Sequence, residues 1–583
     1  MQGNHKFNIC RFLLLEVGVL EPIGHRIIME GETPMKIKFC GAAISVTGSC
    51  HLITTDKYKI LLDCGQFQGS KALEELNFGD FGFDPKEIDF VILSHSHIDH
   101  SGRIPLLVNR GFQGKIYCTD ATADLADIML KDSGYIHEKE AEWSNRKAER
   151  SGKPMVDPLF TYNDAVDSLK YLNPIIYGQL IELNPDVKLK FSDAGHILGS
   201  AIIELWIKEN DKISKIVFSG DLGVKNKPIL NDPAAIEEAD YLIMETTYGD
   251  RVHEPNEKSV STLIEIILNT TRRGGTVVIP SFAVGRTQEI IYELNMFYEQ
   301  HDEYKKELEK IMVYVDSPMA TSATEIFRRN AQVFDDETRN YILKGDNPLD
   351  FKNLKFTRTS EESIQLNFNT NPKIIISASG MCEAGRIKHH LKHNLWNSKS
   401  SIVFVGYQAV GTLGRSIVNG DLDVSIFGEK IHVNAEIHNL QGFSGHADRD
   451  DLLDWLSGFK KMPHKIFLVH GEEESKKGFA AIVKQSLGYD CTVIEDVSEY
   501  SLDNDERLEM GDTKGRVFTE EQLLGIKEKL ARVHDELETI LYNTHLVVDE
   551  DMTTDRINEI SNIVLELEKN SIKLGSSVTK EKV

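Results

Sequence analysis

The sequence predicts a layered α/β fold, in which helices cover the faces of β-sheets, in a chain of more than one domain. Three observations support this prediction. At 583 residues, the chain exceeds the size at which a single hydrophobic core keeps growing. Short β-rich apolar runs recur along it, and amphipathic helical patterns or turns separate them. This mixture is typical of sheets packed against helices.

Composition excludes several classes of protein. The net charge of −25 offers no global attraction to a polyanion, although it does not exclude a locally positive groove around metal ions. No apolar run approaches the roughly 20 residues that span a bilayer, so we expect no membrane association. The seven cysteines are odd in number and form no C-x-x-C pair, which favours a reducing cytoplasm.

The first block of elements begins at about Met35. Residues 1–34 are expected to be a poorly ordered extension, and Arg11 and Glu16 interrupt their apolar start, which disfavours a signal peptide. A long amphipathic helix is predicted over residues 121–150. Strands are predicted around it, at residues 89–94, 115–119, 189–195, 201–207, 215–221 and 241–249.

A second α/β block follows. Its strands, at residues 276–282, 311–317, 372–379 and 401–408, each lead into a helical stretch, which predicts a parallel sheet. From about Phe518, apolar residues recur at helical spacing and predict a hairpin of two helices. We expect this tail to serve packing or oligomerisation, which makes a homodimer plausible.

The segment "SHSHIDH" carries the densest group of potential metal ligands. His95 and His97 lie on one side of an extended chain, and Asp99 and His100 follow at the start of a short helix. Two adjacent cations would satisfy this spacing. The alternative is a polar strand-to-helix loop with Asp99 as N-cap. It would leave four crowded polar groups without partners, so we disfavour it.

Further ligand candidates follow other predicted strands. His196 lies in "SDAGHILGS", Asp221 in "VFSGDLG" and His470 in "FLVHGEE". Taken alone, each is more readily interpreted as a turn or helix-start residue. Because the same placement recurs, we expect a site of imidazoles and carboxylates.

Several ordered motifs resemble those of the metallo-β-lactamase superfamily, in its β-CASP branch of nucleic-acid-processing hydrolases. The resemblance spans about residues 35–497. The members that the sequence resembles are bacterial RNA-degrading enzymes and the pre-mRNA 3′-end cleavage endonuclease of eukaryotes. The superfamily motifs are "LLDCG" with Asp63, "HSHIDH", "DAGHILGS" and "FSGDLG". The β-CASP motifs are "METTYGDR" with Glu245, "FSGHAD" with His446 and "LVHGEEE" with His470.

The resemblance implies a domain plan. An αββα sandwich over residues 35–244 is interrupted by a β-CASP domain over 245–423, with a largely parallel sheet. Residues 424–510 complete the sandwich, and 511–583 form a C-terminal helical extension.

The resemblance also implies how two ions are bound. One ion has three histidine ligands, the other has Asp99 and two histidines, and Asp221 bridges them. The ligand sets are His95, His97 and His196 for one ion, and Asp99, His100 and His470 for the other. Imidazole and carboxylate without thiolate suit two zinc ions per chain, although manganese or iron also fit by ligand type. Asp63 is expected to orient ligands by hydrogen bonding.

The reaction expected at such a site is phosphodiester hydrolysis. Two ions would supply hydroxide at neutral pH. His446 would protonate the leaving group, and Glu245 would hold His446 in the right orientation. Asp99, Glu245 and His446 are therefore the predicted catalytic residues. Arg286, Arg386 and Arg415 follow glycine-rich turns and are expected to contact phosphate, with salt bridges as the alternative. The histidines of "IKHHLKHN" are expected on a helix face rather than as ligands.

The sequence therefore predicts a zinc-dependent ribonuclease acting on single-stranded RNA. The mode of cutting, endonucleolytic or from a 5′ end, is left open. The alternatives are a DNA-directed nuclease, another metallo-hydrolase on the same scaffold and, least favoured, a non-catalytic RNA-binding subunit. Glu245 and His446 argue against a small-molecule hydrolase, because their motifs belong to the nucleic-acid branch.

Overall fold

The computed structural model describes residues 35–508, except 44, 153, 210–211, 255, 409–410, 441 and 504–505. The predictions made for residues 1–34 and for the C-terminal helices lie outside the described residues. None of the described helices has the length and apolar character needed to cross a membrane.

Two sheets form the centre of the first domain. In spatial order, the eight-stranded sheet contains β23 (Arg507–Leu508), β22 (Ser498–Ser501), β1 (Lys36–Phe39), β2 (His51–Thr54), β3 (Lys59–Leu62), β4 (Phe90–Ile92), β5 (Lys115–Thr119) and β6 (Leu172–Ile175). The seven-stranded sheet contains β21 (Thr492–Val493), β20 (Lys465–Val469), β11 (Tyr241–Glu245), β10 (Lys212–Phe218), β9 (Ala201–Glu209), β8 (Val187–Asp193) and β7 (Ile181–Asn184).

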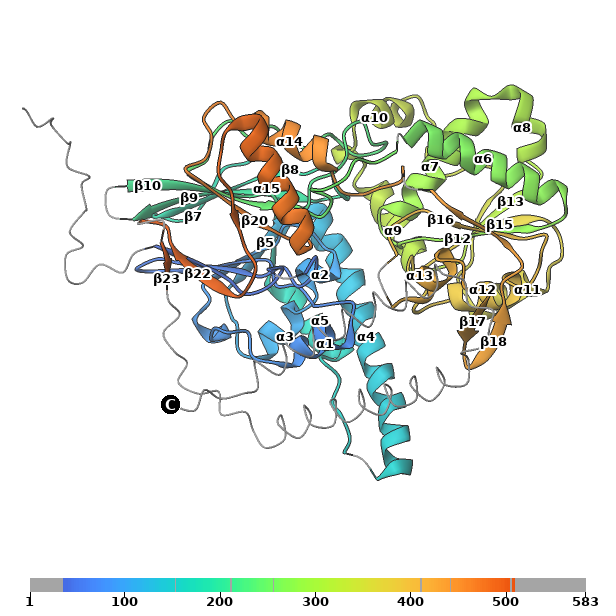
Figure 1. Ribbon diagram of the computed structural model, residues 1–583, viewed down its shortest axis with the longest axis horizontal. Helices are drawn as coiled ribbons and strands as arrows, with labels where there is room; N and C mark the ends of the chain where they lie inside the picture. Colours follow the sequence, from blue (N-terminus) through green and yellow to red (C-terminus); the bar gives the residue numbers. More distant parts are fainter. Residues whose placement is uncertain are drawn as a thin grey trace, which may run out of the picture. The chain divides into compact units, whose positions relative to one another are not determined.

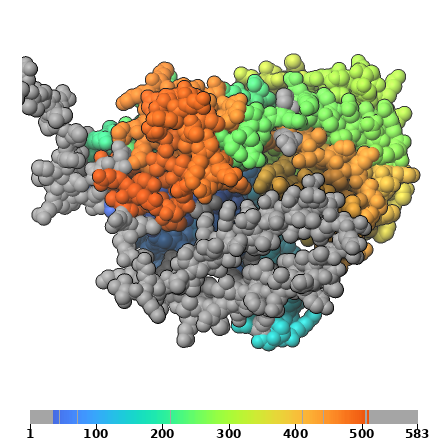
Figure 2. All heavy atoms as spheres, in the orientation of Figure 1, coloured from blue at the N-terminus to red at the C-terminus, as the bar shows by residue number. Residues whose placement is uncertain are grey.

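The two sheets pack face to face, with helices on both outer faces. Alternating apolar residues from both sheets, such as Ile53, Phe191 and Phe467, share one buried core between them. A second core lies under α3 (Ile104–Asn109), α4 (Asp120–Ser151) and α5 (Tyr162–Ser168). A third lies under α14 (Arg449–Ser457) and α15 (Glu473–Leu487), whose outer sides form the surface in the space-filling view (Figures 1 and 2). The predicted αββα sandwich is confirmed.

Parallel pairing gathers several strand ends at one edge. In the first sheet β3, β4, β5 and β6 pair in parallel, and in the second β10, β11 and β20 do so. Their carboxyl ends therefore point in a common direction within each sheet. Predicted site residues follow the ends of β4, β10 and β20, and Glu245 is the last residue of β11.

A third, six-stranded sheet is parallel throughout, as predicted for the second block. Its strands, in spatial order, are β14 (Leu354–Phe356), β13 (Met312–Val315), β15 (Lys373–Ser377), β12 (Thr276–Pro280), β16 (Ser401–Phe404) and β19 (Glu436–Asn439). One core lies under α6 (Asn256–Arg272), α7 (Arg286–Gln300) and α9 (Pro318–Arg329), and another under α12 (Ile387–Asn394) and α13 (Leu413–Val418). The remaining α-helices and strands of the described residues are α1 (Lys71–Glu75), α2 (Ile98–Ser101), α8 (Asp302–Leu308), α10 (Asp336–Leu343), α11 (Ser360–Phe368) and the hairpin of β17 (Asp423–Ile426) and β18 (Glu429–His432).

The six-stranded sheet is inserted into the chain of the seven-stranded sheet. β11 pairs directly with β20, and the chain between them builds the six-stranded sheet and its helices. Its edge strand β19 lies beyond the predicted boundary at residue 423. We therefore propose that the inserted domain continues to residue 439.

Candidate metal centre

Three histidines converge at one end of the sandwich. His95 and His97 follow β4, and His196 follows β8. The Nδ1 atom of His97 lies 3.2 Å from Nε2 of His95 and 3.1 Å from Nε2 of His196. Together with Asp221, these residues form a cluster whose candidate ligand atoms lie within 4.8 Å of one another.

A second group adjoins the first. Asp99 and His100 lie on α2, and His470 follows β20. The Nε2 atoms of His100 and His470 are 3.0 Å apart, and Oδ2 of Asp99 is 3.5 Å from Nε2 of His470. This is a second set of candidate ligand atoms within 4.8 Å of one another.

Asp221 lies between the two groups. Its Oδ2 atom is 3.5 Å from Nε2 of His95 and 3.3 Å from Nε2 of His100. Its Oδ1 atom is buried and has no hydrogen-bond partner among the described residues. Burial alone would raise the pKa of Asp221, but the neighbouring histidines, His100 first, hold it well below the usual range. The carboxylate thus faces both groups of candidate ligands.

Three of the candidate ligand histidines have the protonation state that metal binding requires, and a fourth does not. Burial alone would lower the pKa of His100, but Asp221, Asp99 and Asp63 raise it well above its usual value. Burial is the main cause that lowers the pKa of His95 and His196 well below the usual range and that of His97 to about 4. These rings are neutral at pH 7, with a lone pair to donate. Neutral imidazoles converging on a buried, incompletely hydrogen-bonded carboxylate fit a divalent ion.

Hydrogen bonds behind the ligands fix their orientation. Oδ2 of Asp63 lies 2.7 Å from Nδ1 of His100 and also accepts a hydrogen bond from the Ser94 hydroxyl. Nδ1 of His196 lies 2.8 Å from the carbonyl oxygen of Gly445. In each ring the other nitrogen, Nε2, therefore faces the ligand cluster.

Two of these residues adopt a backbone conformation that is rare outside glycine. The φ angle is +58° at Asp63 and +50° at His470. Left-handed residues of this kind cluster at functional sites, because the surrounding structure must hold them there. Here each one directs its side chain towards the ligand cluster.

His446 and Glu245 form a pair beside the cluster. Nδ1 of His446 lies 3.3 Å from Oε2 of Glu245, which is fully buried, whereas the His446 side chain is 22% exposed. Burial alone would lower the pKa of His446, but Glu245, together with Asp221 and Asp99, raises it above its usual value. Glu245 also accepts hydrogen bonds from the Leu222 amide and the Thr247 hydroxyl. The pair can hold a proton near the ligands, with one side open to solvent.

The three predicted phosphate contacts have different surroundings. Nη1 of Arg286 lies 2.6 Å from the Glu289 carboxylate, and the guanidinium packs against the loop that carries His446. Nη1 of Arg386 lies 2.6 Å from Oδ1 of Asp316. Arg415 alone has no ion pair among the described residues, and its Nη1 lies 3.4 Å from the carbonyl oxygen of Gln408.

The structure adds two polar clusters that the sequence reasoning missed. Lys227, Glu289 and Arg286 form a buried ion cluster. Asp316 pairs with His390, the one fully buried histidine of "IKHHLKHN", at 2.6 Å. The i, i+3 spacing of Arg286 and Glu289 on α7 was a usable signal for the first cluster. The sequence contained no comparable signal for the second.

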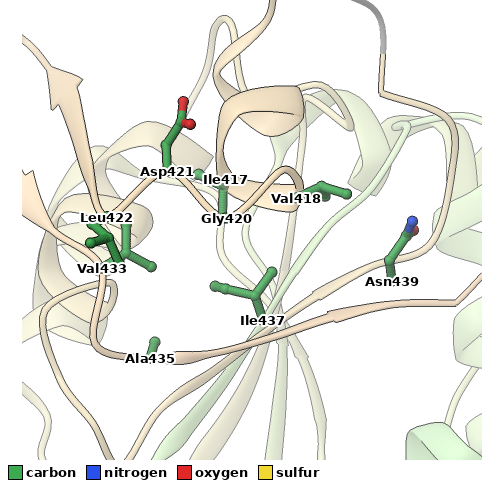
Figure 3. A pocket seen from close by; sticks show the side chains of 9 residues that line it. All are labelled: Ile417, Val418, Gly420, Asp421, Leu422, Val433, Ala435, Ile437 and Asn439. Carbon is green, nitrogen blue, oxygen red and sulfur yellow. The ribbon is translucent and has the colours of Figure 1, made fainter. Parts of the chain in front are cut away.

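A pocket of about 280 Å³ lies between α13 and the strands beside it, outside this centre (Figure 3). Its lining is mainly apolar and includes one carboxylate, Asp421. The lining residues are Ile417, Val418, Gly420, Asp421, Leu422, Val433, Ala435, Ile437 and Asn439. None of the predicted site residues takes part, so the pocket is not the candidate metal centre.

Three protein-family models match the chain. They are described as the metallo-beta-lactamase superfamily, matching residues 45–168, the Beta-Casp domain, matching 287–417, and the Zn-dependent metallo-hydrolase RNA specificity domain, matching 430–494.

Named relatives match over most of the chain. A protein named Ribonuclease TTHA0252, from Thermus thermophilus, is 40% identical over 76% of this chain and 94% of its own length. A protein named Transcription termination factor FttA, from Methanocaldococcus jannaschii, is 34% identical over 80% of this chain and 72% of its own length. A protein of the same name from Methanosarcina mazei is 31% identical over 83% of this chain and 75% of its own length.

Proposed function

The chain belongs to the β-CASP branch of the metallo-β-lactamase superfamily, and from this premise we propose the reaction it performs and the residues that perform it. It is a metal-dependent ribonuclease that hydrolyses phosphodiester bonds of RNA. The observation that supports this assignment best is the convergence of seven candidate ligands from distant strand ends beside the Glu245–His446 pair.

We propose two zinc ions, bound by the two groups described above with Asp221 between them. When bound, such a pair lowers the pKa of a shared water towards ~7 and neutralises charge that develops on phosphoryl oxygens. Asp99 belongs to the more exposed side of the centre, with a side chain 19% exposed. Asp63 and Gly445 hold the His100 and His196 rings in place through their Nδ1 atoms.

His446 is proposed to protonate the leaving group. A departing ribose alkoxide is a strong base and gains from a proton delivered in the transition state. Glu245 orients His446 through Nδ1 and favours its protonated form, which leaves Nε2 to donate towards substrate. Because the Glu245 carboxylate also accepts hydrogen bonds from the Leu222 amide and from the amide and hydroxyl of Thr247, its position is fixed before substrate arrives.

Single-stranded RNA is the proposed substrate. The family model that covers residues 430–494 is described as an RNA specificity domain, and one relative is named a ribonuclease. A DNA-directed nuclease is the main alternative. A cytoplasmic location and a homodimer stay predictions, and light scattering on the full chain tests the second.

The assignment is tested with RNAs labelled at either end, with a 5′ triphosphate or monophosphate, against a matched DNA. Cleavage that requires zinc and is absent from Asp99→Ala supports the proposal, and the fragment pattern separates internal cutting from 5′ digestion. Equal activity of Asp99→Ala, or cleavage of DNA alone, contradicts it. Elemental analysis of the metal-replete protein should give two ions per chain.

A further inference from the structure

The carboxyl ends of the inserted sheet carry three loops that meet one another. β12, β15 and β16 are adjacent parallel strands, and they lead into residues 281–285, 378–381 and 405–408. In open parallel sheets ligands bind outside the carboxyl ends of the strands, where neighbouring connections run in opposite directions. The connection from β12 leads towards β13 and that from β16 towards β19, on opposite sides.

Phe282 stands exposed at this point. Its side chain is 42% exposed, and it belongs to none of the apolar cores of the described residues. A Cβ at Gly380 would lie 3.1 Å from the Phe282 ring, and one at Gly406 would lie 3.8 Å from it. The two glycines thus let neighbouring loops approach the ring closely, so it rests on backbone rather than in a core.

The loop that carries Phe282 is fixed in place. The Thr287 hydroxyl donates to the Phe282 carbonyl oxygen at 2.7 Å, and the Ser281 amide donates to the Ser377 carbonyl oxygen at 3.0 Å. The ring therefore holds one position while nearly half of its surface stays exposed. A single exposed ring is common on protein surfaces, so a binding role requires further exposed groups beside it.

Tyr407 is a second exposed ring, 38% exposed, directly after Gly406. Its loop is tied to that of Gly380 by Gln408, whose buried amide donates to the carbonyl oxygens of Gly380 at 3.0 Å and Gly406 at 3.1 Å. The loop that carries Phe282 reaches the metal centre at its other end, where a Cβ at Gly285 would lie 3.1 Å from Ile197, the residue after the candidate ligand His196.

A cation without an ion pair lies next to these rings. Nη1 of Arg415 contacts the Gln408 carbonyl oxygen, one residue after Tyr407. The described residues provide no carboxylate partner for it, in contrast to Arg286 and Arg386. Proteins that bind single-stranded nucleic acid without regard to sequence combine exposed aromatic rings with cations in this way.

We propose that Phe282 and Tyr407 form a stacking platform for bases of single-stranded RNA, with Arg415 binding an adjacent phosphate. This inference rests on the proposed function and names the part of the site that holds the bases flanking the cut. Because every base has a π-face, the platform accepts any sequence but requires unpaired bases. It therefore selects single strands over duplexes.

RNA binding tests the platform separately from cleavage. Fluorescence anisotropy of a labelled single-stranded RNA is measured in an Asp99→Ala background, which binds without cutting. Phe282→Ala and Tyr407→Ala should each raise the Kd about 5- to 150-fold, the range expected for losing one stacked base. Phe282→Trp should retain tight binding, because it keeps a ring. Phe368→Ala, which removes a ring 70% exposed at the end of α11, is the matched control and should change nothing.

Abasic RNAs make the test specific for stacking. A set of RNAs carries one abasic nucleotide at successive positions around the cut. At the stacked position, the Kd of the abasic RNA for the Asp99→Ala protein should equal about that of intact RNA for the protein that also carries Phe282→Ala. Abasic RNA and Phe282→Ala together should raise the Kd no further than either change alone. Full additivity at every position, or unchanged Kd in both alanine variants, would overturn the platform while leaving the nuclease intact.

The outcomes also separate this inference from the proposed function. The wild-type chain could bind RNA tightly through the rings of Phe282 and Tyr407 and yet cut no RNA in the presence of zinc. That result would contradict the proposed nuclease function and support the stacking platform. An absence of RNA binding by the wild-type chain refutes both.

Discussion

Two buried histidine–carboxylate clusters in this chain look alike and differ in one respect. The cluster around Asp221 and the cluster around Asp316 both bring imidazoles, carboxylates and strand ends together with almost no exposure. At Asp316 every carboxylate oxygen has protein donors: His390, Ser363, Thr357 and Arg386. At Asp221 the Oδ1 atom accepts no hydrogen bond from the described residues, and Nδ1 of His470 lies 3.6 Å from it. The Asp316 cluster is complete as protein alone, whereas the Asp221 cluster leaves a buried oxygen for a further partner.

The comparison teaches how to separate a structural cluster from a cation site. Residue types do not decide, since both contain histidine and aspartate. The decisive question is whether each buried polar atom already has a hydrogen-bond partner within the protein.

Replacing Asp221 tests the comparison with the largest expected effect. Asp221→Asn keeps the shape but removes the charge that the two proposed cations would share, so RNA cleavage should fall at least about 10⁴-fold. Metal content by elemental analysis should fall below that of the wild-type chain, with circular dichroism unchanged. A variant that keeps its full metal content and its turnover would show that the unpartnered oxygen was misinterpreted.

His446 shares features of both clusters. Its Nδ1 atom is paired with Glu245, as the atoms of the Asp316 cluster are paired, whereas its Nε2 atom is left for a further partner. His446→Ala should slow cleavage of RNA by about 10²–10⁴-fold, the usual range for a general acid. Hydrolysis of an aryl phosphodiester should slow much less, because a phenolate leaves without a proton. Comparing the two substrates in steady-state kinetics checks this, and equal losses would argue for a purely structural histidine.

Asp316→Ala should show the opposite behaviour to Asp221→Asn. It leaves the fully buried His390 and the half-buried Arg386 without their partner, so the free energy of unfolding should fall by about 3–5 kcal/mol in urea denaturation. Metal content should match the wild-type chain. Loss of metal without loss of stability would reverse the assignment of the two clusters.

The pH dependence of stability gives the smallest effect. Burial alone would raise the pKa of Asp316, but hydrogen bonds from His390 and from the Ser363 and Thr357 hydroxyls hold it well below its usual range. A depressed carboxyl pKa adds stability above the unfolded pKa of about 4, and this stability is lost as pH falls further. The stability difference between wild type and Asp316→Asn should therefore stay constant from pH 8 to 5 and narrow below about pH 4, as followed by urea unfolding. A difference that narrows above pH 6 instead would assign the effect to another group.

Local patterns made much of the fold and site predictable. The predicted helix "IKHHLKHN" coincides with α12 (Ile387–Asn394), and strand-end placement pointed to His196, Asp221 and His470. The edge strand β19 gave no signal, because only one face of "EIHN" meets apolar neighbours and none of its residues is fully buried.

Long-range pairing is what the sequence could not predict. Asp316 and His390 are 74 residues apart, and only the closed sheet brings them together. The same holds for the exposure of Phe282. Its apolar character predicts a core, but the loop that carries it lies past the end of a buried strand.

The insertion between β11 and β20 also affects when the protein becomes active during its own synthesis. His470 emerges from the ribosome 370 residues after His100, with the whole inserted domain between them. At about 5–20 residues per second, this delay is roughly 20–70 s. The second ligand group is incomplete throughout that interval. A nascent chain therefore acquires its RNA-cutting centre only after most of its own message has been translated.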